Sequence, residues 1–206
     1  MIGVYDYTVV LTYLSFLSSL TGIYFALNGN SFAAIICLMF SGLCDMFDGK
    51  VARTKKNRTD EEKKFGIQID SLSDLVAFGL LPSVIGYGLG IADTWMFFVL
   101  YLLPLCALIR LAFFNVIEEI RSSNTDEVRT EYLGLPGTST AIILPIIYFL
   151  KKVTESYFVY IYAIALLVIS ILFITKFKMV KFKTKGLIVL ACIGIIIFLM
   201  LMLWYL

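Results

Sequence analysis

The sequence predicts an all-α fold, a polytopic integral membrane bundle of about seven transmembrane helices. Of its 206 residues, 60% are hydrophobic and only 16% are charged, and the mean hydropathy is +0.92. These values lie far outside the range of soluble domains. The sequence shows no internal repeat and no second domain, so we expect residues 1–206 to form a single transmembrane domain.

Seven apolar runs are long enough, or nearly so, to cross a hydrocarbon core of about 30 Å. They lie near Tyr7–Asn28, Ser31–Lys50, Phe65–Gly90, Thr94–Val116, Gly137–Leu150, Ser156–Thr175 and Gly186–Leu206. The first run lacks a basic leading segment and a small-residue cleavage site, so we expect a retained helix rather than a signal peptide. Asn28-Gly29-Asn30 breaks the first run from the second, and Pro136-Gly137 begins the fifth, which is the shortest.

The basic residues of the short loops give the orientation. Arg53–Lys64 holds six Lys or Arg and Lys176–Lys185 holds five, whereas the opposite side has only Lys151 and Lys152. Lys and Arg accumulate in cytoplasmic loops. We therefore expect a protein of the cell membrane with its N-terminus inside and, after an odd number of crossings, its C-terminus outside.

Two of the runs carry carboxylates where lipid would be expected. Asp45 and Asp48 lie about 60° apart on one helix, and Asp70 and Asp74 lie about 40° apart on the next. Asp45 and Asp74 each lie about 12 Å inside the cytoplasmic end of their run, at the rise of an α-helix. The two pairs are therefore expected to meet at one level, in the cytoplasmic half of the membrane.

These four carboxylates need compensation. Each ionised carboxylate costs roughly 2.5 to 3.5 kcal/mol inside a bilayer. Hard divalent cations such as Mg²⁺, Mn²⁺ and Ca²⁺ take oxygen ligands, and a two-metal site uses bridging carboxylates. A softer metal is excluded, because the sequence has no His and its four Cys are scattered through apolar runs.

The residues that flank the carboxylates fit a phosphate site. Gly49 removes a side chain where a ligand can approach the backbone, Arg53 offers a fork for phosphate oxygens, and Gly66 opens the next helix. Glycines in membrane helices also serve close helix packing. Beside the carboxylates, we favour a ligand site, because intramembrane charges are seldom structural.

The pattern resembles the signature of the CDP-alcohol phosphotransferases, D-x-x-D-G-x-x-A-R, a spacer, and G-x-x-x-D-x-x-x-D. The matching residues are Asp45, Asp48, Gly49, Ala52, Arg53, Gly66, Asp70 and Asp74. The spacer between Arg53 and Gly66 has twelve residues, more than the family commonly has. Because the extra residues fall in a charged loop, we expect the helices to be unaffected.

The resemblance implies a membrane enzyme that transfers a phosphate-bearing group from a CDP-linked donor to an alcohol and releases CMP. It also implies a homodimer and a six-helix core, to which this chain adds a helix. Asp45, Asp48, Asp70 and Asp74 would hold one or two Mg²⁺ or Mn²⁺ ions, with Asp74 also acting as the general base. The residues implied to bind the CDP-lipid are Gly49, Ala52, Arg53, Gly66 and Asp70.

Three stretches resemble the phosphatidylserine synthase branch of that family, which implies L-serine as the acceptor. Phe65–Ser83 matches its FG, DSL-x-D and FG-x-x-P elements, and Gly134–Pro136 matches its G-L-P segment. Arg110–Asn115 resembles R-L-A-R-F-N, with Phe113 in place of the second Arg. Alternative acceptors are inositol phosphate, glycerol phosphate or an amino alcohol. A cation-coupled transporter or channel is a further alternative, but the broken helices and inverted repeats that favour one are not seen.

Arg110 and Asn115 are the candidate serine-binding residues. Arg110 lies about two turns inside the cytoplasmic end of the fourth run, where it either snorkels to the interface or binds the serine carboxylate bidentately. Asn115 can add a hydrogen bond. The basic run Lys176–Lys185 reads as the cytoplasmic signal or a patch for anionic membrane lipids, or it reaches the substrate phosphates. No nucleic-acid partner is expected.

Overall fold

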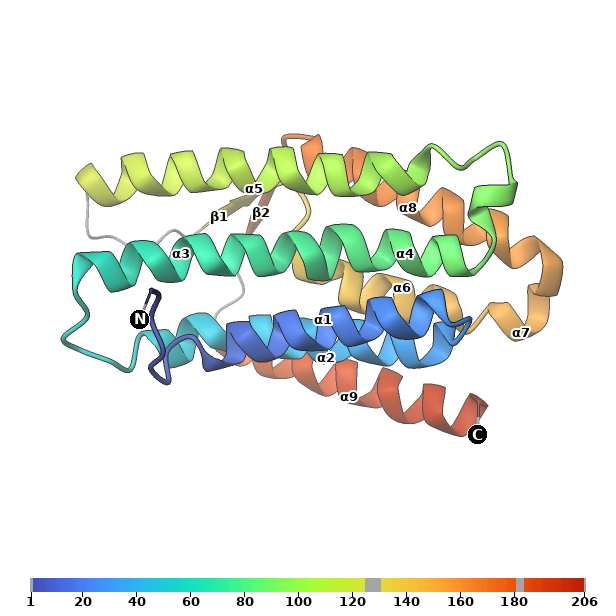
Figure 1. Ribbon diagram of the computed structural model, residues 1–206, viewed down its shortest axis with the longest axis horizontal. Coiled ribbons are helices and arrows are strands. Elements are labelled where there is room, and N and C mark those ends of the chain that lie inside the picture. Colours follow the sequence, from blue (N-terminus) through green and yellow to red (C-terminus); the bar gives the residue numbers. More distant parts are fainter. Residues whose placement is uncertain (1, 125–130, 181–183, 206) are drawn as a thin grey trace.

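The protein is an elongated bundle whose long helices run side by side (Figure 1). The computed structural model describes residues 2–124, 131–180 and 184–205. The N-terminus and the C-terminus lie toward opposite ends of the long axis in Figure 1. Residues 181–183 of the predicted basic loop and residue 206 of the last predicted span lie outside the described residues.

Within the described residues, six helical stretches are long and apolar enough to cross a membrane, and an apolar helix at Gly137–Tyr148 is shorter. The predicted fold class is therefore confirmed, and the chain is an integral membrane protein. The long stretches are α1 (Val10–Leu27), α2 (Ser31–Ala52), α3 (Asp60–Asp74) continued by the π-helical turn η1 (Leu75–Leu80) and α4 (Leu81–Gly88), α5 (Val99–Asn124), α8 (Phe158–Ile174) and α9 (Thr184–Tyr205). The shorter elements are η2 (Ile91–Asp93), η3 (Gly137–Ser139), α6 (Thr140–Tyr148), α7 (Lys151–Thr154) and η4 (Glu155–Tyr157).

The start of α3 differs from the prediction. The helix begins at Asp60, so the expected start at Phe65 is wrong. Thr59 and Glu62 form a capping box, in which the Thr59 side chain accepts from the Glu62 amide and the Glu62 side chain accepts from the Thr59 amide. This box satisfies two amides that the first turn would leave unpaired. The charged run is thus the first turn of a helix, and only residues 53–59 form the loop.

A π-helical turn interrupts the third span directly after Asp74. Pro82, in the first turn of α4, has no amide hydrogen to donate to the preceding turn. Gly79 lets the turn approach α5, since a Cβ there would lie 3.0 Å from the Ala107 Cβ. Single π turns inside α-helices are frequent at functional sites.

A two-stranded antiparallel sheet joins two connections on one side of the bundle. β1 (Glu131–Leu133) pairs with β2 (Lys178–Val180), with Glu131 opposite Val180. The amide of Gly134 also donates to the carbonyl of Phe177 at 2.8 Å. These strands were not predicted, although Lys alternates with Phe and Met over residues 176–179. They hold the segment before α6 against the segment after α8.

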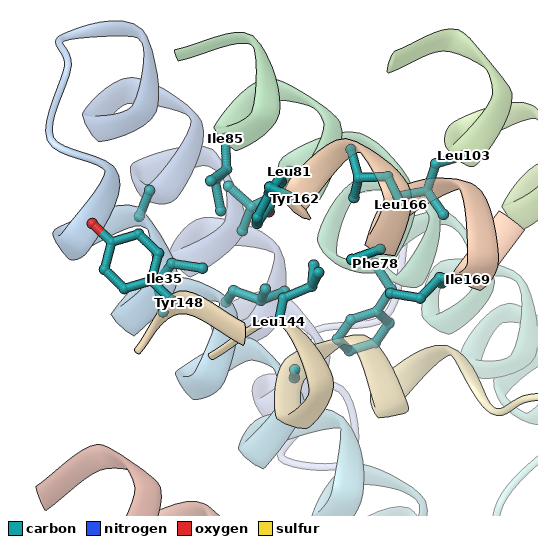
Figure 2. Close-up of a cluster of buried hydrophobic side chains, with 14 of the residues drawn as sticks. Ile35, Phe78, Leu81, Ile85, Leu103, Leu144, Tyr148, Tyr162, Leu166 and Ile169 are labelled. Carbon is teal, nitrogen blue, oxygen red and sulfur yellow. The ribbon is translucent and has the colours of Figure 1, made fainter. Parts of the chain in front are cut away.

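The apolar core lies between the helices. Figure 2 shows its largest side chains, which come from α2, η1, α4, α5, α6 and α8. They are Ile35, Phe78, Leu81, Ile85, Leu103, Leu144, Tyr148, Tyr162, Leu166 and Ile169. α9 lies at the edge of the bundle (Figure 1).

Candidate functional site

Three carboxylates from two helices meet inside the bundle. One oxygen each of Asp45, Asp70 and Asp74 lies within 4.8 Å of the others. Asp45 lies on α2, whereas Asp70 and Asp74 lie one turn apart on α3 and therefore share a face. α1 packs against both helices and holds them beside each other.

These residues fit a divalent metal. The Oδ1 atom of Asp70 is buried and has no hydrogen-bond partner within the described part of the chain. An ionised carboxylate can only accept, so a buried oxygen without a donor is stabilised by a cation. Clustered oxygen ligands at this separation are those that hard divalent ions bind. The group can thus hold a divalent metal ion.

Asp48 lies beside this trio and has a different partner. Its side chain is 8% exposed, and its Oδ2 accepts a hydrogen bond from Thr12 Oγ1 of α1 at 3.2 Å. Thr12 also accepts through its carbonyl from Ser73 Oγ of α3 at 3.3 Å. Thr12 was not among the predicted site residues, because no local pattern links α1 to the carboxylates.

A cavity of about 350 Å³ opens onto the carboxylates from one side. Its polar lining includes Asp45, Asp48, Asp70 and Arg53, with Ser139 from η3. An apolar cavity of about 370 Å³ adjoins it between α2, α6 and α9. The two cavities share the lining residues Met46, Thr138, Ile142 and Leu190. A polar chamber and an apolar groove therefore lie next to each other.

A third cavity, of about 170 Å³, lies on the α1 side of the carboxylates. It is lined by all five residues that the sequence predicts to bind the CDP-lipid, namely Gly49, Ala52, Arg53, Gly66 and Asp70. The lining also includes Thr8 and Thr12, and the cations Arg58 and Lys63. The sequence analysis did not single out these four residues. Asp48, Gly49, Arg53 and Asp70 line both this cavity and the 350 Å³ chamber.

The structure separates the two predicted serine-binding residues. The Arg110 guanidinium lies over the rings of Phe114 and Phe173, at 4.8 and 5.5 Å from their centroids. Asn115 instead accepts a hydrogen bond from Ser71 Oγ of α3 at 2.8 Å. Five positions on a helix turn a side chain by about 140°, so the two residues occupy different faces of α5.

Arg110 nevertheless reaches toward the carboxylates. Its Nη1 atom lies 3.7 Å from where a Cβ on Gly137 would be, next to η3. It is close enough to Asp45 for the two charges to attract each other. It also lines a cavity of about 170 Å³ with Lys176.

An ion network fixes the loop between α2 and α3. Lys55 Nζ lies 2.6 Å from Asp6 Oδ2 and 2.8 Å from Glu62 Oε1. The hydrogen bond from Lys55 lowers the pKa of Asp6 to about 2, and the bonds to Asp6 and Glu62 raise the pKa of Lys55. The network ties the N-terminal segment and the loop to the first turn of α3.

This chain matches the model of a protein family and is similar in sequence to several known proteins. A family model described as CDP-alcohol phosphatidyltransferase matches residues 8–206. A CDP-diacylglycerol–serine O-phosphatidyltransferase of Mycobacterium leprae is 34% identical over 135 residues, which are 64% of this chain and 43% of that protein. One of Saccharomyces cerevisiae is 37% identical over 114 residues, 54% of this chain and 40% of that protein. An archaetidylserine synthase of Methanothermobacter thermautotrophicus is 35% identical over 109 residues, 52% of this chain and 46% of that protein. The chain spans less than half the length of these relatives.

Proposed function

Since this chain belongs to the CDP-alcohol phosphatidyltransferase family, we propose that it transfers the phosphatidyl-type group of a CDP-activated lipid to the hydroxyl of L-serine and releases CMP. The names of its relatives support serine as the acceptor. Those relatives include a synthase of archaetidylserine and transferases that use CDP-diacylglycerol, so the lipid chains of the donor are to be tested in both ester and ether forms.

One observation carries the proposal: the carboxylates line a polar chamber that adjoins an apolar groove. A CDP-activated lipid has a charged nucleotide, a diphosphate and apolar chains. The 350 Å³ chamber beside Asp45, Asp48 and Asp70 offers a place for the diphosphate, and the 370 Å³ groove offers an apolar surface for a chain. A soluble phosphate donor would not need that groove.

The carboxylates define where the chemistry occurs. We propose that Asp45, Asp48, Asp70 and Asp74 hold one or two Mg²⁺ or Mn²⁺ ions. Such ions, when bound, neutralise the diphosphate and the charge that develops on the leaving CMP. The donor-binding role of Gly49, Ala52, Arg53, Gly66 and Asp70 is supported by the single cavity that all of them line.

Asp74 is the proposed general base. It accepts the proton of the serine hydroxyl while the serine oxygen forms a bond to the phosphorus of the phosphatidyl group. The bond between that phosphorus and the oxygen of CMP breaks, and CMP leaves with the electron pair. A base within hydrogen-bond reach of the acceptor hydroxyl contributes typically 10² to 10⁴-fold to such a step.

The serine carboxylate is assigned to Arg110. A guanidinium offers a bidentate fork that matches a carboxylate, and Arg110 lies on the side of α5 that faces η3 and Asp45. The position of Asn115 on another face supports a different role. We propose that it orients α3 through Ser71, which precedes Asp74 by one turn, rather than contacting the same carboxylate.

The finer statements about location and assembly are also proposals. The family match over residues 8–206 supports one domain over residues 1–206. The basic loop next to the carboxylates supports an active site that faces the cytoplasm of the cell membrane, with the N-terminus inside. A homodimer stays a prediction, to be checked by crosslinking in membranes.

A serine incorporation assay tests the proposal. Purified protein in detergent receives radiolabelled L-serine, Mg²⁺ or Mn²⁺, and CDP-diacylglycerol or its ether analogue, and both labelled lipid and CMP are measured. We expect equal amounts of the two products. Turnover of inositol phosphate, glycerol phosphate or ethanolamine in place of serine would move the assignment to another acceptor. CMP release without any lipid product would contradict a transferase.

A further inference from the structure

Arg58, which lies outside the signature, folds back onto the site from the loop between α2 and α3. Its Nη2 donates to the carbonyl of Glu62 at 3.1 Å. Its Nε is buried and has no hydrogen-bond partner in residues 2–124, 131–180 and 184–205. A buried donor without an acceptor is costly, by about 1 to 3 kcal/mol. The guanidinium is therefore held in place with bonding capacity unused.

Gly66 makes the room for this guanidinium. A Cβ on Gly66 would lie 2.7 Å from Arg58 Nη2, closer than real side chains approach. The space that the sequence analysis assigned to a ligand is thus partly filled by Arg58 itself. Arg58 consequently faces the same cavity as Gly66 and Asp70.

Charged side chains of both signs line this cavity. Asp48 and Asp70 supply carboxylates, and Arg53, Arg58 and Lys63 supply cations. At about 170 Å³ the cavity is smaller than the roughly 300 Å³ from which cavities for whole small molecules begin. It fits one part of a larger substrate, and its three cations select an anionic part.

We propose that Arg58 binds the phosphate of the CMP half of the donor and keeps that contact in the product. This inference rests on the proposed function, which supplies CMP as the leaving group. When the bond to phosphorus breaks, the CMP phosphate gains negative charge, and a guanidinium fork stabilises it more than it stabilises the donor. The long spacer of this chain supplies the residue, so Arg58 is a substrate-binding residue in addition to Arg53.

The test is the affinity for CMP itself, measured by titration calorimetry in detergent with Mg²⁺ present. Arg58→Gln is expected to weaken CMP binding about tenfold or more, the usual effect of losing a charge-assisted bond. Lys56→Gln is the matched control, because it removes the same charge from an exposed side chain of the same loop, and it should bind CMP as the wild type does.

A second variant tests whether the position of the Arg58 guanidinium, and not only its charge, matters for CMP binding. Gly66→Ala keeps the charge of Arg58 but displaces its guanidinium, so it should weaken CMP binding in the wild type and add little in the Arg58→Gln background. In the transfer assay, Arg58→Gln should raise the KM for the CDP-lipid and leave the KM for serine unchanged.

The outcomes distinguish this inference from the proposed function. Unchanged CMP affinity in both Arg58→Gln and Gly66→Ala overturns the role of Arg58, even if the wild type converts serine. A wild type that binds no CMP overturns it as well. If CMP binds and Arg58→Gln weakens it, but no labelled lipid forms from serine, the inference stands and the assignment of serine as acceptor fails.

Discussion

The two ends of the bundle bury polar groups in opposite ways. At the end that carries α7, Ser31 Oγ and Tyr148 OH share a hydrogen bond of 2.8 Å. Lys151 Nζ donates to both, at 2.7 Å to Ser31 and 3.2 Å to Tyr148. Tyr205 of α9 donates to the Tyr148 carbonyl at 2.9 Å, and Lys152 donates to the carbonyl of Trp204. Figure 1 places α7 far from the loop that follows α2.

At the carboxylate end, half-buried groups of like charge repel one another. Asp45, Asp70 and Asp74 are acceptors of like charge within 4.8 Å, and one oxygen of Asp70 has no partner in the described residues. Polar groups that satisfy each other stabilise a fold, whereas a group that needs an outside partner marks a site of binding. The contrast predicts that substitutions at one end change stability and substitutions at the other change activity.

The largest effect is expected from removing the metal ligands. Asp45→Asn, Asp70→Asn or excess EDTA should lower turnover by about 10³-fold or more, since a metal supplies several kcal/mol of stabilisation to the transition state. The metal-free variants should melt no lower than the metal-free wild type, because each loses a repulsive charge. Calorimetry and the serine assay measure the two effects. Full turnover in excess EDTA would refute the metal site.

The second-largest effect is expected at Asp74, where a substitution should slow the reaction and leave donor binding largely intact. Asp74→Asn should lower kcat by roughly 10²-fold or more, as the loss of a general base does, with the affinity for the CDP-lipid largely kept. Single-turnover kinetics and lipid binding are measured on the same preparation. If donor affinity falls in parallel with the rate, Asp74 is mainly a metal ligand.

The arrangement of the carboxylates could be predicted because helical geometry alone determines it. Residues at similar distances from a shared loop lie at similar depths, so the two pairs were expected to meet without a template. The true start of α3 was missed, although the capping-box pattern Thr59-x-x-Glu62 is visible in the sequence. The separation of Arg110 from Asn115 follows from five helical positions as well, although the sequence analysis placed both against serine.

Other features could not be predicted from the sequence. The bond from Thr12 to Asp48 joins residues 36 positions apart, and it depends on how α1 packs against α2. The return of Arg58 to Gly66 depends on the conformation of the loop, which no periodic pattern reports. The pairing of β1 with β2 joins two short segments that lie far apart in the chain. Each depends on tertiary contacts rather than on local propensity.

A smaller change in activity is expected at Arg110. Arg110→Lys keeps the charge but cannot form a bidentate fork, so the apparent KM for serine should rise about tenfold. The KM for the CDP-lipid should change much less, because Arg53 and Arg58 line a different cavity from Arg110. Steady-state kinetics with each substrate varied in turn measures both constants. Serine kinetics equal to the wild type would remove Arg110 from the acceptor site.

Substitutions at the end that carries α7 should change the stability of the protein and leave its activity unchanged. Tyr148→Phe removes the hydroxyl that pairs with Ser31 and Lys151, which should cost about 1 kcal/mol of folding free energy. The carboxylates are untouched, so kcat should stay at the wild-type value. Thermal unfolding in detergent and the serine assay provide the two readings. A large loss of kcat at unchanged stability would show that the end that carries α7 also affects activity.

The smallest effect concerns the surface network that fixes the loop carrying Arg58. Asp6→Asn removes one of the two carboxylates that contact Lys55 and should lower the melting temperature slightly, because exposed ion pairs contribute little. The folded pKa of Asp6 is about 2, below its usual 3.8. Its contribution is therefore fully present above pH 3.8 and is lost as the pH falls toward 2. The difference in melting temperature between wild type and Asp6→Asn should thus be present at pH 5 and shrink as the pH is lowered. A difference that grows on acidification would show that Asp6 does not stabilise the loop through its charge.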